Sequence, residues 1–308
     1  MISRMTHAIS VKAVTKVFDD GNKALNEVDL IIPKGSFFAL LGHNGAGKTT
    51  LIKSICQLTS ITSGDILVNG KNLKTNSMYA KRKIGLVPQE FNCNPFHTVE
   101  QILYQFGGYQ GLTKNELDKK IPALLDNLFL LEKRKTLFRA LSGGMKRAVT
   151  IARALIHEPD ILFLDEPTAG VDVEIREGMW KFFKALNKKG LTIVLTTHYL
   201  EEAEQLCKEM ALINRGKIII SGDIKKLLAD QESAMIELTV DQLPKLDQLP
   251  CYLVKKGQKG LMCHLPKGKA IHDVFDELNG LGCRVKSFEV VTGRLEQLLK
   301  QSMDRKAV

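Results

Sequence analysis

Short apolar runs divide the first part of the chain into expected strands. Residues Ile9–Phe18 and Leu25–Ile32 mix apolar and polar positions at the spacing of half-buried strands, with turn residues between them. Phe37–Leu41 is apolar throughout, which is typical of a strand buried on both faces of a parallel sheet. Gly42 ends this run, and Lys48–Gln57 follows with helical character. The pattern predicts a strand, a glycine-rich turn and a helix, in that order.

The middle of the chain, residues 98–157, has the pattern of several consecutive helices. Two pairs of residues have the spacing of capping boxes that begin helices, Thr98 with Gln101 and Thr113 with Glu116. Pro122 is expected to begin a further helix over Ala123–Leu131.

Buried strands then return at Ile161–Leu164 and Leu191–Thr197, with a helix expected over Glu174–Lys188 between them. This order predicts an α/β core built from βαβ units, with a helical insertion. Met210–Ile220 is expected to form a hairpin that turns at Asn214-Arg215-Gly216. No internal repeat is visible.

The character of the chain changes after a linker helix expected at Ile224–Asp230. Short elements follow: strands at Met235–Val240, Tyr252–Lys255, Gly260–Leu265 and Cys283–Val291, and helices at Ala270–Leu278 and Gly293–Gln301. We therefore expect a nucleotide-binding domain of residues 1–230, followed by a small α+β domain of residues 233–308.

Composition narrows the class of protein. The 308 residues are 44% hydrophobic and 25% charged, as in a globular protein in water. No apolar run approaches the roughly 18–20 residues of a membrane-spanning helix, and the first residues do not resemble a secretory signal. We therefore expect a cytosolic chain. Its net charge of +10 is spread along the chain, which favours a solvated surface, with an anionic membrane face as the second interpretation and a nucleic-acid site as the third.

The strongest chemical signal is the segment GHNGAGKT at Gly42–Thr49, which matches the phosphate-binding pattern GxxxxGK[ST]. Glycines let the backbone fold around phosphates with its N–H groups pointing inward. Lys48 can reach the β- and γ-phosphates, and the hydroxyl of Thr49 can bind Mg²⁺. The helix N-terminus adds a partial positive charge at the same place.

Two further segments carry polar groups that suit nucleotide chemistry. The strand Ile161–Leu164 leads to Asp165, a hard ligand for a metal ion, and to Glu166, which can accept a proton from an attacking water. In LSGGM, Ser142 is a good helix N-cap, and the two glycines after it expose the first N–H groups of the next helix. Alone, LSGGM could also be an ordinary helix start.

LSGGM resembles the signature motif of the ABC ATPase superfamily, and it lies between the phosphate loop and the acidic strand, as in that family. Gln89 in VPQE resembles the family's Q-loop, Asp172 in TAGVD its D-loop, and His198 in TTH its switch histidine. The resemblance covers about residues 8–230. It implies a P-loop NTPase (RecA-like) core with a helical subdomain at about residues 92–157.

This resemblance also implies roles for individual residues. The expected catalytic residues are Glu166 and His198. The expected nucleotide-binding residues are Phe18, Gly42, His43, Asn44, Gly45, Ala46, Gly47, Lys48, Thr49, Thr50 and Gln89. Magnesium is expected on Thr49, Gln89 and Asp165. Two departures from the common family pattern are Phe18, where a Tyr often stacks on adenine, and Met145, where Gln is commoner.

The same resemblance implies an assembly. Two copies would enclose two ATP molecules, each between one copy's Lys48 loop and the other copy's Ser142, Gly143 and Gly144, with Asp172 at the dimer contact. The segments PQEFNCNPFHTV, LSGGMKR, DEPTAGVD and TTHYLEEAE together resemble the ATPases of type-2 ABC exporters. The expected partner is then a multi-span permease that holds the chain at the cytoplasmic face of the inner or plasma membrane. Phe91–Val99 would help to form the groove for this permease.

Two alternatives stay open at this point. A non-transport ABC ATPase that acts on the ribosome or on nucleic acid is less favoured, because the chain has a single ATPase core and no long coiled coil. The C-terminal domain could be a binding or regulatory module, or an appendage that stabilises a dimer.

Overall fold

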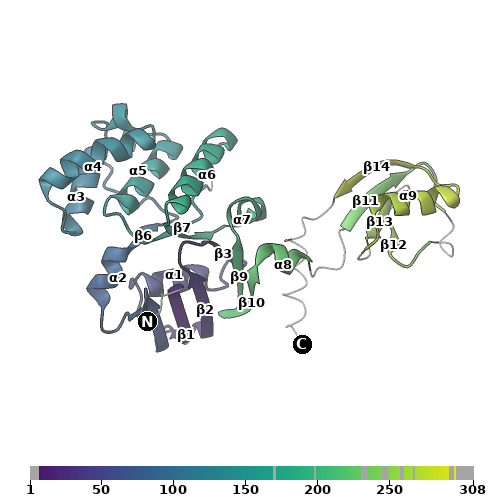
Figure 1. Cartoon of the computed structure of the whole chain (residues 1–308), viewed down its shortest axis with the longest axis horizontal. Helices are drawn as coiled ribbons and strands as arrows, with labels where there is room; N and C mark the ends of the chain where they lie inside the picture. Colours follow the sequence, from purple (N-terminus) through teal and green to yellow (C-terminus); the bar gives the residue numbers. More distant parts are fainter. Residues whose placement is uncertain are drawn as a thin grey trace. The chain divides into compact units, whose positions relative to one another are not determined.

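The computed structural model describes residues 7–168, 171–197, 199–229, 235–244, 249–256, 260–265, 268–290 and 295. The chain divides into two compact units, Met1–Gly222 and Asp223–Val308, which are best described separately (Figure 1). In the described part of the chain, no helix combines the length and the apolar character that crossing a bilayer requires.

The first unit contains two sheets. An antiparallel sheet has the order β2-β1-β4-β5, with β1 at His7–Val17, β2 at Lys23–Pro33, β4 at Ser63–Val68 and β5 at Lys71–Asn72. A six-stranded sheet has the order β10-β9-β3-β8-β7-β6, with β3 at Phe37–Leu41, β6 at Ile84–Val87, β7 at Ile161–Asp165, β8 at Thr192–Thr196, β9 at Glu209–Asn214 and β10 at Lys217–Asp223. Strands β9, β3, β8, β7 and β6 run parallel.

The helices of this unit alternate with the parallel strands, as the sequence predicts. They are α1 at Lys48–Ile55, α2 at Ser77–Lys83, α3 at Val99–Tyr109, α4 at Lys114–Asn127, α5 at Gly143–Leu155, α6 at Val173–Lys188 and α7 at Leu200–Leu206, with short 3₁₀ turns at Leu131–Lys133 and Phe138–Ala140. Five short elements, β4, β5, α2, β6 and α7, have no counterpart among the elements expected from the sequence.

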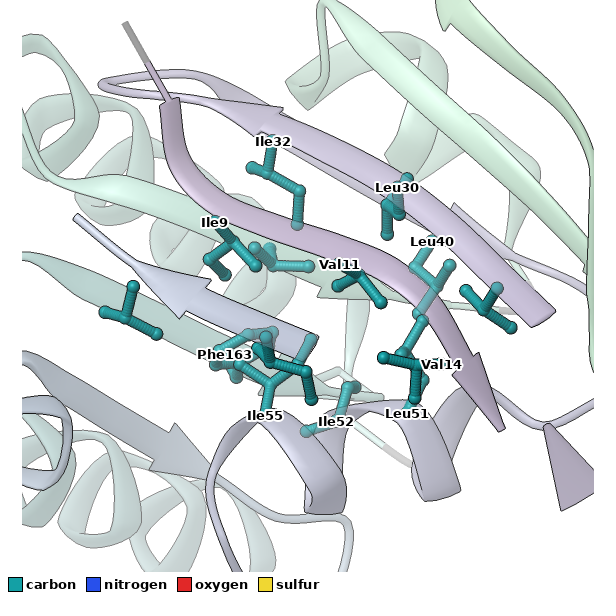
Figure 2. Close-up of a cluster of buried hydrophobic side chains, with 14 of the residues drawn as sticks. Ile9, Val11, Val14, Leu30, Ile32, Leu40, Leu51, Ile52, Ile55 and Phe163 are labelled. Carbon is teal, nitrogen blue, oxygen red and sulfur yellow. The ribbon is translucent and has the colours of Figure 1, made fainter. Parts of the chain in front are cut away.

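The main core joins the two sheets to α1. Figure 2 shows side chains of β1, β2, β3, α1 and β7 meeting in one cluster. Val11, Leu40 and Phe163 are at most 2% exposed there. Because Leu51 and Ile52 of α1 belong to this cluster, the core holds α1 directly behind β3 and sets the geometry of the loop between them.

Two neighbouring isoleucines of β2 test this packing. Ile32 lies in the core at 1% exposure, whereas Ile31 is 52% exposed on the other face of the strand. Ile32→Val is expected to lower the free energy of unfolding by about 1 kcal/mol, since a buried methyl group is lost. The matched control Ile31→Val is expected to change it by less than about 0.5 kcal/mol. Urea unfolding followed by the fluorescence of Trp180, the single tryptophan of the chain, measures both; equal effects would contradict the assigned strand faces.

Helices α3, α4 and α5 share a second apolar core, which makes this region a helical subdomain. Both expected capping boxes are confirmed: Thr98 begins α3 and Thr113 begins α4.

The expectation that Pro122 begins a new helix is wrong, because Pro122 lies inside α4. Ile121 and Leu125, on either side of the proline, are buried in the subdomain core, and this packing outweighs the backbone hydrogen bond that proline removes.

The second unit has a four-stranded antiparallel sheet of order β12-β13-β11-β14, in addition to α8 at Ile224–Ala229 and α9 at Ile271–Gly280. The strands are β11 at Met235–Val240, β12 at Leu253–Lys256, β13 at Gly260–His264 and β14 at Val285–Val290. The expected α+β character is therefore confirmed. Of the helix expected at Gly293–Gln301, Leu295 is the one residue that the structure describes, so that prediction is not tested.

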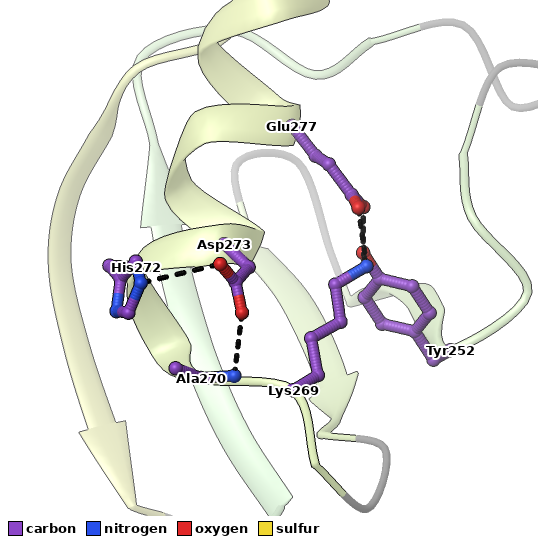
Figure 3. A network of polar contacts seen from close by, with 6 residues as sticks. All are labelled: Tyr252, Lys269, Ala270, His272, Asp273 and Glu277. Atoms are coloured by element: carbon purple, nitrogen blue, oxygen red, sulfur yellow. Dashed lines mark hydrogen bonds and ion pairs between the residues drawn. The ribbon is translucent and has the colours of Figure 1, made fainter.

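A polar network braces α9 in this unit (Figure 3). The amine of Lys269 donates to the hydroxyl of Tyr252 over 2.8 Å and pairs with the carboxylate of Glu277, which also accepts from Tyr252. The pKa of Glu277 is held below its usual range by Lys269. Asp273 accepts from the backbone N–H of Ala270 and so satisfies one of the N–H groups that lack a partner within the helix at the start of α9.

Candidate functional site

The glycine-rich loop lies between the end of β3 and the start of α1, as predicted. Gly47 has φ of 111° and precedes Lys48, the first helical residue, with no side-chain cap. The first N–H groups of α1 therefore stay available to a ligand. A Cβ atom on Gly42 would lie 2.4 Å from the carbonyl oxygen of Ile213, so only glycine fits where the loop passes β9.

Lys48 bends back over this loop. Its Nζ donates to the carbonyl oxygens of Gly42 at 2.7 Å and His43 at 3.0 Å. Burial lowers the pKa of the amine, while Glu166 and Asp165 act in the opposite direction. The amine is thus held in place by uncharged backbone oxygens. A phosphate is charged and would bind the amine more strongly than these oxygens do.

A cavity of about 680 Å³ opens in front of the loop. Of the residues expected to serve nucleotide, metal or catalysis, it brings together Phe18, Asn44, Gly45, Gly47, Lys48, Thr49, Thr50, Gln89, Asp165 and Glu166. Gly42, His43 and Ala46 belong to the loop but do not line the cavity: the ring of His43, for example, contacts the carbonyl oxygen of Asn44 and the side chain of Asn214. The size of the cavity is within the usual range for small-molecule sites.

Several residues of the cavity wall were not expected from the sequence. Asn22, Lys23 and Ala24 come from the turn before β2 and its first residues, and Arg215 and Gly216 come from the β9–β10 turn. The segment Asn214-Arg215-Gly216 was interpreted only as a hairpin turn. Lys23 and Arg215 nevertheless add two positive charges to the wall, which suits a polyanionic ligand. Phe18 is 38% exposed there, so its ring is available for stacking.

Asp165 and Glu166 follow β7 and differ in their surroundings. Asp165 is buried and accepts from the Thr196 hydroxyl over 2.5 Å. Glu166 has φ of 49°, an unusual value for a residue other than glycine, and its N–H donates to the carbonyl oxygen of Thr196 over 3.1 Å. The amide of Gln89 donates to the Glu166 carboxylate over 3.2 Å. Thr196, at the end of β8, therefore holds both acidic residues.

The donors in this cavity fit a magnesium ion. Thr49, Gln89 and Asp165 offer a hydroxyl, an amide carbonyl and a carboxylate, all of them the hard oxygen ligands that Mg²⁺ prefers. Among the described residues, no group of three or more His, Cys, Asp or Glu is placed to hold a metal ion.

The LSGGM segment does not line this cavity. Ser142 caps α5 and accepts from the N–H of Met145 over 3.3 Å, and Ser142 and Gly143 are exposed. A Cβ atom on Gly143 would meet nothing within 4 Å. Asp172 precedes α6, at a separate position from the cavity lining. His198 lies outside the described residues, so its role stays a prediction.

Comparison with known proteins supports the resemblance. A family profile described as ABC transporter matches residues 25–169. Nod factor export ATP-binding protein I of Cupriavidus pinatubonensis is 34% identical over 91% of this chain and 93% of its own length. The chain belongs to the ABC transporter family. It is an ATP-binding protein of that family, and as such an ATPase.

Other relatives agree with this assignment. Nod factor export ATP-binding protein I of Rhizobium meliloti is 40% identical over 71% of this chain and 65% of its own length. A solved ATP-binding subunit of an ABC transporter superposes with a TM-score of 0.66 at 28% identity, covering 71% of this chain and 91% of its own. A dimeric bacterial ABC transporter cassette gives 0.64 at 27% identity, covering 70% and 98%. The expected cassette fold is confirmed.

Proposed function

We propose that this ATPase powers an exporter and that it works as a pair of copies that enclose two ATP molecules. The observation that carries the dimer is that Ser142 and Gly143 are exposed and do not line the cavity that contains Lys48. A helix N-terminus with two glycines suits a phosphate, yet it does not line the cavity of its own chain. A second copy would bring it there. One similar solved structure is described as a dimer, and another as a post-hydrolysis state bound to ADP and Pi.

In the proposed site, the N–H groups of Gly45–Thr49 and the Lys48 amine bind the phosphates, and Phe18 stacks on the adenine. Thr49, Gln89 and Asp165 would hold Mg²⁺, which supplies charge neutralisation on the β- and γ-phosphates. The attacking water would then approach the γ-phosphate from the side of the cavity where Gln89 and Glu166 lie.

Glu166 is the proposed general base. Water attacks the γ-phosphorus, and Glu166 accepts the proton that the water loses. The bond between the γ-phosphorus and the bridging oxygen breaks, and the electron pair leaves on ADP. His198 and the partner's Ser142, Gly143 and Gly144 would stabilise the charge on the γ-phosphate, while Asp172 contacts the second copy.

The export role rests on relatives whose names describe Nod factor export. We infer that the chain pairs with a separate multi-span permease and is peripheral to the cytoplasmic face of the membrane through it. Phe96 supports this surface, because its apolar ring is 66% exposed within Phe91–Val99. Residues 233–308 are proposed to form an accessory domain, supported by their own sheet and apolar core.

Affinity purification of the tagged chain from detergent-solubilised membranes of its source tests whether the chain binds a permease. A protein with about six hydrophobic spans is expected to co-purify, because a transporter needs several helices to form a path. Phe96→Asp is expected to reduce this recovery at least about tenfold, since it puts a charge into a buried contact. Phe129→Asp, which changes a 93% exposed ring, is the matched control. Recovery of ribosomes or nucleic acid in place of a membrane protein would contradict the exporter.

A further inference from the structure

Helix α5, which begins at the signature, carries two buried arginines that bind the backbone of residues 88–92, the segment that contains Gln89. Arg147 is 4% exposed, and its two terminal nitrogens donate to two consecutive carbonyl oxygens, Pro88 at 2.7 Å and Gln89 at 2.9 Å. A planar guanidinium that binds two successive carbonyls fixes both the distance and the tilt of that stretch of backbone.

Arg153, two turns further along α5, continues the contact. It is 7% exposed and donates to the carbonyl oxygen of Asn92 at 3.0 Å, with a weaker contact to that of Phe91 at 3.4 Å. The Arg147 guanidinium also lies 5.2 Å from the centre of the Phe91 ring. The backbone from Pro88 to Asn92 is therefore attached to α5 at both of its ends.

Burying these two guanidinium groups costs free energy of hydration, so the need to fill space does not by itself explain arginine at these positions. Burial lowers the pKa of both guanidinium groups, a sign that the charged form loses hydration there. Nε of Arg147 has no hydrogen-bond partner among the described residues. An apolar side chain would fill the same space without these costs. What Arg147 adds is a pair of directed bonds to the carbonyl groups of Pro88 and Gln89, on either side of the Gln89 Cα.

We propose that Arg147 is a positioning residue for ATP hydrolysis, which sets Gln89 in the site through its backbone and links it to the signature helix. The Gln89 amide already reaches Glu166 at 3.2 Å, so a small tilt of its peptide would move it away from both the base and the metal ligands. Because Ser142 caps the same helix that carries Arg147, engagement of Ser142 by the ATP of a second copy would be passed to Gln89. This inference rests on the proposed roles of Gln89 and of the dimer.

A double-mutant cycle on the full chain tests it. Arg147→Lys keeps the charge and the aliphatic stem but cannot bind both carbonyls with one planar group. The cycle combines it with Gln89→Ala, and the matched control is Arg134→Lys, an exposed arginine paired with Glu100. Three quantities are measured for each variant: ATP turnover, affinity for the non-hydrolysable analogue AMP-PNP with Mg²⁺ and with EDTA, and the melting temperature.

Arg147→Lys is expected to lower turnover about 10- to 100-fold, as small misplacements in active sites do. Its AMP-PNP affinity is expected to fall in Mg²⁺ but to change less than about twofold in EDTA, where only the phosphate loop and the adenine contact act. The double variant is expected to be within about threefold of Gln89→Ala alone, because both changes remove the same interaction. The control is expected to match the wild type.

Other outcomes would overturn the inference in distinct ways. Multiplicative effects in the double variant would show that Arg147 does not act through Gln89. Loss of AMP-PNP binding in EDTA with a lower melting temperature would assign Arg147 to the stability of the fold. If Gln89→Ala lowered ATP turnover while Arg147→Lys left it unchanged, only this inference would be wrong, and the proposed role of Gln89 would stand. Normal turnover and normal Mg²⁺-dependent binding in Gln89→Ala would remove the proposed role of Gln89 as well.

Discussion

Replacing Glu166 with Gln is expected to lower ATP turnover at least about 100-fold, the usual contribution of a positioned general base. The change keeps the shape of the side chain and its place after β7, but a neutral amide cannot accept the proton of the attacking water. The unusual φ of Glu166 and its backbone bond to Thr196 aim the side chain into the cavity beside Gln89. Steady-state phosphate release from the purified chain measures the effect.

ATP affinity of the Glu166→Gln variant is expected to stay within about threefold of the wild type, because the phosphate contacts come from the loop and Lys48. Glu132→Gln, which changes an exposed carboxylate of the helical subdomain, is the matched control and is expected to leave turnover unchanged. Turnover near the wild-type rate in the Glu166 variant would show that another group takes the proton.

Mixing two inactive variants is expected to restore activity, which is the most direct consequence of a shared site. Lys48→Met removes the buried amine and should abolish ATP binding by its own cavity. Gly143→Asp puts a carboxylate where the partner's γ-phosphate is expected. The fold should accept it, because the new Cβ meets nothing within 4 Å and an acidic residue suits the first turn of a helix. Each variant alone is expected to lose at least about 99% of turnover.

A mixed pair has one complete site, formed by Lys48 of the Gly143→Asp copy and the intact signature of the Lys48→Met copy. With random pairing, the mixture is expected to reach up to about a quarter of wild-type turnover. Gly108→Asp, at another exposed glycine with open space around its Cβ position, is the matched control for an added charge. Full activity of Gly143→Asp by itself would mean that each chain completes its own site.

Many elements of both units could be predicted from local sequence. Phe37–Leu41 and Met235–Val240 are strands with the predicted bounds, and the capping boxes at Thr98 and Thr113 form as expected. In each case the deciding interactions lie within a few residues of one another along the chain. The prediction failed at Pro122, where the local preference of proline for a helix start conflicts with the burial of Ile121 and Leu125.

The residues of the candidate site also form two groups, those that local sequence reveals and those that it does not. The phosphate loop and the Asp165-Glu166 pair could be recognised because each is a continuous segment next to a buried strand. Thr196 and Arg215 could not, since nothing near them in the sequence marks a residue whose partner is brought by the parallel sheet or by a hairpin turn. The contacts of Arg147 could not be predicted for the same reason, because its partners are backbone carbonyls 58 and 59 residues away, which leave no side-chain pattern.

The sequence by itself therefore determined the chemistry of this protein: the phosphate loop, the acidic pair, the signature and the family to which they belong. These features depend on side chains and glycines that are contiguous along the chain. Tertiary structure alone decided how the parts meet. It placed Lys23 and Arg215 in the cavity wall, attached Gln89 to α5 through Arg147, and left Ser142 exposed and apart from Lys48. Such contacts depend on packing between distant segments, which no short stretch of sequence specifies.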